Sequence, residues 1–245
     1  MLLLYHCSNS YASQKVRLYL AENSISWESY HIDLLKQEHL TEAYIKINPR
    51  GLVPALADNG KIILNSTDIM RYLEEHYVKR SSFSKEPKQE IYDFCKRDEG
   101  LHDPHIRTLS YHYLWMNQNK TPEEISRILE LAKKHPDNAR GAFLARAIQR
   151  QLTAAEIALA KTEVVVAIKE MEERLQNSKS GFLFADQYTM ADAAGTARLF
   201  RLQLLGFEKT MSQYPLICAY YDKMQQRPSF VTADMASVNT PQSEH

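Results

Sequence analysis

The first eighty residues alternate between short apolar runs and segments with helical periodicity. Residues 2–5 form an apolar run, and Val16 and Leu20 then mark one face of a helix. Residues 27–34 have the alternation of a second strand, and residues 41–47 have the pattern of a short helix. Strands that alternate with helices in this way are typical of an α/β unit.

A hairpin and a third helix complete this first unit. The pair Asn59-Gly60 separates two short β-rich runs, residues 53–57 and 61–64. Asn-Gly between two such runs is the strongest local signal for a β-hairpin, because both residues accept a positive φ. An amphipathic helix is then predicted to begin near residues 65–68. The predicted order is therefore β-α-β-α-β-β-α.

The remainder of the chain has helical patterns alone. Thr121, followed by Pro122 and two glutamates, is a strong helix start, and the His-Pro-Asp sequence at residues 135–137 ends that helix. Residues 138–176 are periodic and rich in alanine, so they predict one long helix. A last helix is predicted to follow Pro215.

Another helix start combines Thr189 with Asp192 in a capping box, in which Asp takes the place of the usual Glu. The Asp192 carboxylate is expected to accept the Thr189 backbone N–H, and the loss of such a cap costs about 0.5–2 kcal/mol of stability. We therefore assign Asp192 a structural role. The helix that begins here is predicted to end at Gly206.

These patterns divide the chain into two domains. Residues 79–88 are polar, rich in serine and contain Pro87, so they predict a linker. We expect residues 1–78 to form the α/β domain and residues 89–230 to form an all-helical domain, followed by a flexible tail at residues 231–245. The expected fold class is thus α/β plus all-α.

The composition is that of an ordinary soluble globular protein without a charge bias. The 245 residues include 30 Lys and Arg against 30 Asp and Glu, so a nucleic-acid partner is not expected. Cys7, Cys95 and Cys218 are far apart and lack the spacing of a zinc site, which favours a reducing, cytoplasmic setting without a disulfide framework or a metal. No apolar run is long enough for a membrane span, so no membrane partner is expected.

Several short motifs occur in an order that resembles the glutathione S-transferases. They are Ser10 ahead of Lys-Val-Arg, His39-Leu40 before Asn48-Pro49, the sequence Val-Pro-Ala-Leu at residues 53–56, Asn65-Ser66, and the capping box at residues 189–192. The spacing looks most like the theta, zeta and omega groups. The ganglioside-induced differentiation-associated proteins and the bacterial β-etherases are the most similar branches, although the hydrophobic C-terminal anchor of some of the former is not matched.

This resemblance implies a thioredoxin-like first domain that binds glutathione, with Ser10 as the catalytic residue. A thiol with a pKa of about 8.5 is mostly protonated at pH 7, and a serine hydroxyl beside a helix N-terminus can stabilise its thiolate. The alternatives are that Ser10 only caps the helix, that Cys7 is the nucleophile of a Cys-x-x-Ser motif, or that Tyr5 takes the role. We expect Ser13 to be the N-cap, and Cys7 and Tyr5 to pack in the interior.

Further residues are implied to hold glutathione. Val53-Pro54 is expected to form a cis bond and to pair its backbone with the peptide, the alternative being an ordinary strand-edge proline. Asn65 and Ser66 are expected to hold the γ-glutamyl end at a helix start, the alternative being simple capping. His39 is expected to hold the glycine carboxylate, the alternative being a solvated surface histidine.

The function implied by the resemblance is that of a glutathione S-transferase. Glutathione is then the co-substrate, and a hydrophobic electrophile enters from the helical domain. Glutathione-dependent ether cleavage or dehalogenation would use the same site. The alternative from another class is a non-catalytic glutathione-binding protein, which Asn65 and Leu52 favour because many relatives carry other side chains there. A homodimer is one assembly that the resemblance implies, and the extra segment at residues 117–138 could block it.

Overall fold

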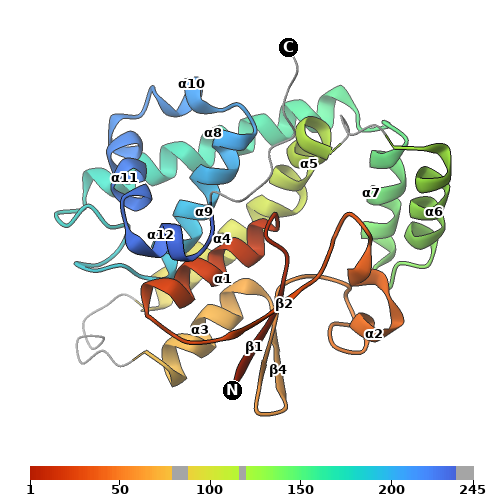
Figure 1. The fold of residues 1–245 in the computed structure, drawn as a ribbon. Helices are drawn as coiled ribbons and strands as arrows, with labels where there is room; N and C mark the ends of the chain where they lie inside the picture. Colours follow the sequence, from red (N-terminus) through yellow and green to blue (C-terminus); the bar gives the residue numbers. More distant parts are fainter. Residues whose placement is uncertain (79–87, 116–119, 236–245) are drawn as a thin grey trace.

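The computed structural model describes residues 1–78, 88–115 and 120–235, in which an α/β unit is followed by an array of helices (Figure 1). The strands are β1 (Leu2–His6), β2 (Glu28–His31), β3 (Ala55–Asp58) and β4 (Lys61–Leu64). The helices of this unit are α1 (Tyr11–Glu22), α2 (Glu42–Ile45) and α3 (Ser66–His76), with a 3-10 turn at Glu38–Leu40. The predicted order and the thioredoxin-like fold class are confirmed.

The strands form one mixed sheet in the order β2-β1-β3-β4. β1 runs parallel to β2 and antiparallel to β3, and the turn between β3 and β4 carries Asn59 and Gly60 with φ angles of 47° and 85°. Tyr5 is paired with Ala55, and Ala55 with Leu64. The loop after β1, the residues before β3 and the start of α3 therefore meet at one edge of the sheet.

The second unit contains helices joined by loops and no strand in the part that the structure describes. Its helices are α4 (Lys88–Leu101), α5 (Arg107–Ser110), α6 (Pro122–Lys133), α7 (Asn138–Ile148), α8 (Ala154–Gln176), α9 (Met190–Leu204), α10 (Glu208–Met211), α11 (Pro215–Gln225) and α12 (Pro228–Thr232). Two π-helical turns, His102–Ile106 and Tyr111–Trp115, flank α5. No helix in the described ranges is long and apolar enough to cross a membrane.

The predicted helix starts at Thr121 and Thr189 are confirmed, but the prediction of a single long helix over residues 138–176 is wrong. Thr121 and Thr189 each cap a helix through a complete capping box. Between α7 and α8 the chain turns at Arg150, whose φ is 58°, and a further capping box starts α8, with Thr153 as N-cap and Glu156 as its partner. The alanine-rich periodicity continues across this break, so periodicity alone did not reveal it.

The ends of the helical domain differ from the expected boundaries. The expected linker at residues 79–88 lies outside the described residues except for Lys88, the first residue of α4. The tail was expected to begin at residue 231, but α12 extends to Thr232 and the side chain of Met235 is fully buried. Ala233 and Met235 therefore belong to the packed core, whereas Val231 is 77% exposed.

Helix α1 joins the two units. It packs against α3 on one side of the sheet, with α2 on the other side (Figure 1), and it also packs against α9 and α12. Most of α1 is buried, including Lys15 and Arg17, and one apolar core runs through both units. The helix that begins after Ser10 is therefore held by both domains.

Candidate active site

Ser10 is the residue at which the loop after β1 becomes α1. Its φ and ψ of −80° and 119° are extended, and its Oγ accepts a hydrogen bond from the Ser13 N–H at 3.3 Å. Ser10 is thus the N-cap, and the expectation that Ser13 caps the helix is wrong. The helix starts three residues earlier, and the Oγ of Ser13 instead accepts the Cys7 N–H at 3.4 Å. The cap uses an oxygen lone pair, so the hydroxyl proton of Ser10 remains available to a ligand.

Two buried arginines hold the loop before Ser10. Arg17 of α1 donates a hydrogen bond to the Ser8 carbonyl at 3.2 Å, and Arg201 of α9 donates one to the Asn9 carbonyl at 2.5 Å. Burial lowers the pKa of Arg201 to about 10, so this side chain is still a cation at pH 7. The interior behind the loop is therefore electropositive, which favours an anion in front of it.

Cys7 is buried as expected, whereas Tyr5 is only half-buried and does not lie in the interior. Cys7 is 6% exposed at the end of the sheet, which agrees with a packed thiol. The Tyr5 ring is half-buried between Tyr30 and Tyr44, with ring centroids 5.1 Å and 6.1 Å away.

The peptide bond between Val53 and Pro54 is cis, as predicted. The loop before it is shaped by Asn48, which is buried: its Nδ2 donates to the Leu52 carbonyl at 2.6 Å, and its Oδ1 accepts the Arg50 N–H at 3.1 Å. Sequence reasoning used Asn48 only as part of a motif. The strand register places this loop beside the loop that carries Ser10.

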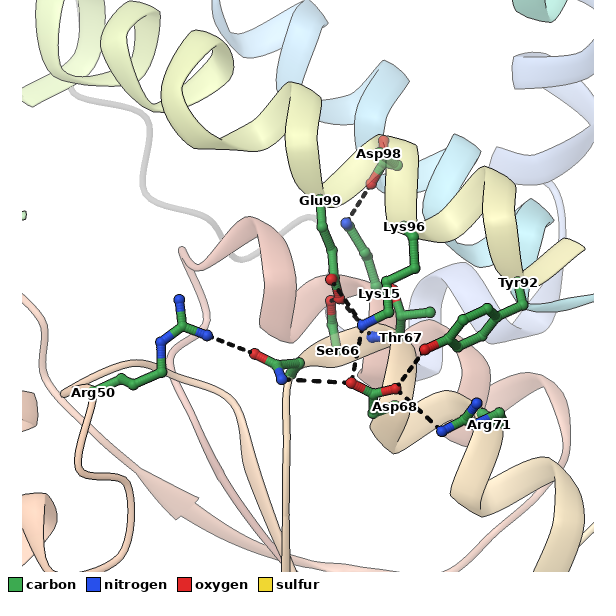
Figure 2. A network of polar contacts seen from close by, with 11 residues as sticks. Lys15, Arg50, Ser66, Thr67, Asp68, Arg71, Tyr92, Lys96, Asp98 and Glu99 are labelled. Carbon is green, nitrogen blue, oxygen red and sulfur yellow. Dashed lines mark hydrogen bonds and ion pairs between the residues drawn. The ribbon is translucent and has the colours of Figure 1, made fainter.

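Asn65 and Ser66 stand at the start of α3, at the same edge of the sheet. Asn65 has a φ of 66°, a conformation that Asn tolerates better than most residues, and its side chain makes no capping bond. Simple capping therefore does not describe the Asn65 side chain, which accepts a hydrogen bond from Arg50 at 3.1 Å. Ser66 Oγ donates to a carboxylate oxygen of Glu99 at 3.4 Å (Figure 2).

Glu99 was missed by the sequence reasoning. It lies on α4 and reaches across to α3, where its Oε1 also accepts the Thr67 N–H at 3.0 Å. Helix N-termini attract carboxylates because their first N–H groups have no partner within the helix. The anion position predicted at Ser66 is therefore occupied by a side chain of the chain itself.

His39 lies away from α3, on the wall of a cavity of about 330 Å³. Burial, with a smaller effect from the charge of His135, lowers its pKa to about 4, so the ring is neutral at pH 7. It is neither a cation nor a fully solvated surface residue. If His39 holds a carboxylate at neutral pH, as predicted for the glycine end of glutathione, it does so through a hydrogen bond from an uncharged ring N–H.

The cavity that His39 lines lies between the two domains. The loop residues Cys7, Ser8 and Asn9 form one part of its wall, and aromatic and aliphatic side chains of the helical domain form another, namely Tyr111, Trp115, Ile128, Leu144 and Ile148. A volume of this size suits a small organic molecule. A larger open hollow of about 1220 Å³ between α4, α8 and residues 177–187 contains none of the predicted site residues.

The antiparallel pair α6 and α7 contributes Ile128, Leu144 and Ile148 to the wall of this cavity. The pair stands apart from the other helices of the domain (Figure 1). It has its own apolar cluster of Ile128, Ala132 and Leu144. The two helices approach closely at Gly141, where a Cβ atom would lie 2.3 Å from the Ala132 carbonyl oxygen. Arg127 of α6 donates a hydrogen bond to the Lys36 carbonyl of the first domain at 2.7 Å, so the pair bridges both domains over the cavity.

A buried charge network lies behind the site. Asp98 of α4 is fully buried and pairs with Lys15 of α1 and with Arg198 of α9, whose Nη2 lies 2.8 Å from Asp98 Oδ1. Burial opposes ionisation of Asp98, but the two cations outweigh it and lower its pKa to about 2. The Tyr11 hydroxyl donates to the same carboxylate at 2.6 Å.

Two family models match the chain in succession. The model for the N-terminal domain of glutathione S-transferases matches residues 4–81, and the model for their C-terminal domain matches residues 138–232. Helices α4, α5 and α6 lie between the two matches. Among the described residues, no cluster of three or more His, Cys, Asp or Glu side chains could hold a metal ion.

Relatives and solved structures cover nearly the whole chain. The glutathione S-transferase TCHQD of Arabidopsis thaliana is 24% identical, over 93% of this chain and 87% of that protein. The tetrachloro-p-hydroquinone reductive dehalogenase of Sphingobium chlorophenolicum is 24% identical over 94% of both chains. The crystal structure of the beta-etherase LigF from Sphingobium sp. strain SYK-6 matches with a TM-score of 0.79 at 23% identity, covering 95% of this chain and 98% of that one, which establishes a shared fold.

Proposed function

Because the chain belongs to the glutathione S-transferase superfamily, we propose that it binds glutathione and transfers it to a hydrophobic electrophile. The observation that carries the proposal is the geometry of Ser10. Its hydroxyl proton is available at the start of a 12-residue helix, and the cis Val53-Pro54 bond lies at the same edge of the sheet. Glutathione would pair with the Val53 backbone, with its sulfur at Ser10 and its γ-glutamyl end at Ser66.

The chemistry required of the site is to keep a thiol ionised. Lowering a thiol pKa by two units corresponds to about 2.7 kcal/mol. A hydrogen bond from Ser10 to the thiolate, the helix N-terminus and the buried cations Arg17 and Arg201 all act in this direction. The thiolate would then attack an activated carbon, forming a C–S bond while the leaving group departs with its electron pair.

The cavity beside residues 7–9 favours a transferase over a protein that only binds glutathione. A transferase needs space for its electrophile, and the aromatic and aliphatic side chains that the helical domain contributes to the cavity wall suit a hydrophobic one. The dehalogenase and the beta-etherase among the similar proteins indicate two more specific reactions, loss of a halide or of an aryl ether oxygen. Both begin with the same thiolate attack, which forms a C–S bond while an aryloxide or a halide leaves with its electron pair. A reductive dehalogenation needs a second glutathione in addition: its thiolate attacks the sulfur of the conjugate, the disulfide forms, and the carbon keeps the electron pair of the broken C–S bond and takes up a proton.

The test is to replace Ser10 and to follow both turnover and thiol ionisation. Ser10→Ala should lower kcat/KM with a generic aryl halide about 10²-fold, the usual effect of removing one well-placed donor to an anion. It should also raise the pKa of bound glutathione, measured by the ultraviolet absorbance of the thiolate. Ser10→Thr keeps the hydroxyl and the cap and should retain both properties. Unchanged thiol ionisation in Ser10→Ala would contradict the serine mechanism.

Binding must be measured separately from catalysis. Calorimetric titration with glutathione followed by a conjugation assay separates a transferase from a binding protein. Binding without turnover of any aryl halide or aryl ether would favour the non-catalytic alternative. Absence of glutathione binding would contradict the proposal as a whole.

A further inference from the structure

The first turn of α3 is capped by a side chain from the other domain. The side chain of Asn65, the residue before the helix, accepts no backbone N–H of that turn; its Nδ2 instead donates to Asp68 Oδ2 at 3.4 Å. Glu99 of α4 supplies the missing acceptor: its Oε1 accepts the Thr67 N–H at 3.0 Å and the Ser66 hydroxyl at 3.4 Å. A carboxylate of the chain thus fills the position proposed for the γ-glutamyl carboxylate of glutathione.

An ammonium group lies beside this carboxylate. Lys96 Nζ is 3.1 Å from Glu99 Oε2 and 2.9 Å from Asp68 Oδ2 (Figure 2). Lys96 and Glu99 are three residues apart on α4, so they are neighbours on its surface. Together they present an ammonium and a carboxylate side by side, the same two charges that the γ-glutamyl end of glutathione carries on one carbon atom.

Asp68 is built to receive a cation. Its Oδ1 accepts the Tyr92 hydroxyl at 2.9 Å, and Arg71 lies 3.4 Å from the same oxygen. Burial opposes ionisation of Asp68, but the hydrogen bonds from Lys96 and Tyr92 outweigh it and lower the pKa, so the carboxylate is charged at pH 7. The side chain is 24% exposed, so solvent and ligands can reach it.

We propose, on the premise that glutathione binds as stated above, that Lys96 and Glu99 occupy its γ-glutamyl site in the empty protein and are displaced by it. The carboxylate of the substrate then replaces Glu99 at Ser66 and Thr67, and its ammonium replaces Lys96 at Asp68. No covalent bond changes, and each ionic contact is exchanged for an equivalent one. The affinity for glutathione is therefore set by a competition within the chain.

The first test removes the competing carboxylate. Glu99→Ala should tighten glutathione binding about 5- to 10-fold in calorimetric titration, the scale of one partly exposed charge-assisted hydrogen bond. Glu90→Ala removes an exposed carboxylate from the same helix and should leave the affinity unchanged. Weaker or equal binding to Glu99→Ala would overturn the proposal, because Glu99 would then be a partner of the ligand or irrelevant to it.

The second test concerns Asp68 and uses a glutathione analogue that lacks the α-amino group. The unmutated protein should bind glutathione at least about 10-fold more tightly than this analogue, whereas Asp68→Asn should bind both equally. A preference for glutathione that persists in Asp68→Asn would overturn the assignment. Equal binding of the two ligands by the unmutated protein would do the same without any variant. If the unmutated protein does not bind glutathione at all, the proposed function fails instead.

Discussion

Asp98 is the buried anion on which cations from two other helices converge, and its replacement by Asn tests how the two domains are joined. Lys15 is contributed by α1 of the first domain, and Arg198 by α9 of the second. The Asp98 side chain is 0% exposed, and those of Lys15 and Arg198 are 1% and 4% exposed. Water therefore cannot replace a contact that is lost here.

The size of the effect follows from the charges. The network holds two cations and one anion, so Asp98→Asn leaves two like charges buried without a counterion. Removing one partner of a buried ion pair costs about 3–5 kcal/mol. In a chain of this length, that loss corresponds to a fall in Tm on the order of 10 °C. The pKa of Asp98, about 2, means that its stabilisation is present above the unfolded pKa and is lost only as the pH falls through about 2.

Lys15→Met is the matched control. It removes one cation and leaves one cation, Arg198, paired with one anion, Asp98. Methionine is similar in length to lysine, so the packing is largely kept. We expect it to cost less than half as much as Asp98→Asn when both are measured by urea unfolding at pH 7. Equal losses in the two variants, or a loss below about 1 kcal/mol in Asp98→Asn, would refute the charge-count argument.

The pKa of Asp192, raised by burial to about 6 from 3.8, means that its stabilisation is present below pH 3.8 and is lost as the pH rises through 6. Compared with Asp192→Asn, the unmutated protein should lose about 2 kcal/mol of unfolding free energy between pH 4 and pH 7 in urea titrations, and a constant difference would contradict this. Leu144→Ala should raise KM for an aryl halide several-fold and leave KM for glutathione unchanged. The same substitution at the exposed Leu159 is the control and should change neither value. An unchanged KM for the aryl halide in Leu144→Ala would contradict the role of this cavity wall in binding the electrophile. Ser10→Cys should lose conjugation and form a mixed disulfide with oxidised glutathione, because a helix N-terminus lowers a thiol pKa. Mass spectrometry should locate the adduct on the introduced thiol, and equal modification of Cys7 in the unmutated protein would favour the Cys-x-x-Ser motif.

The elements that could be predicted from the sequence are those with local chemical signals. Asn59-Gly60 indicates a turn because both residues accept a positive φ, and Thr189 indicates a helix start because its side chain bonds within its own turn. The break between α7 and α8 also had such a signal, the Thr-x-x-Glu sequence that begins at Thr153, but the alanine-rich periodicity around it masked it.

The candidate site was predictable only in part for the same reason. Ser10 and the cis Val53-Pro54 bond lie in short motifs that resemble those of the glutathione S-transferases, and this resemblance indicated them, whereas local capping signals alone pointed to Ser13 as the N-cap. Glu99 and Arg201 act on residues that are 33 and 192 positions away in the chain, and nothing in their own surroundings marks them. Charged residues on a helix are usually solvated, so only the packing of α4 and α9 reveals that Arg201 is buried and that Glu99 bonds to the start of α3.

The separate apolar cluster of α6 and α7 has a consequence for the kinetics of ligand entry. Because Ile128, Ala132 and Leu144 pack with one another and not with the main core, this pair of helices can open locally while the rest of the molecule stays folded. Amide hydrogens of α6 should then exchange with deuterium faster than those of α9. Local opening of this pair would then give a molecule a way into and out of the cavity while the main core stays folded.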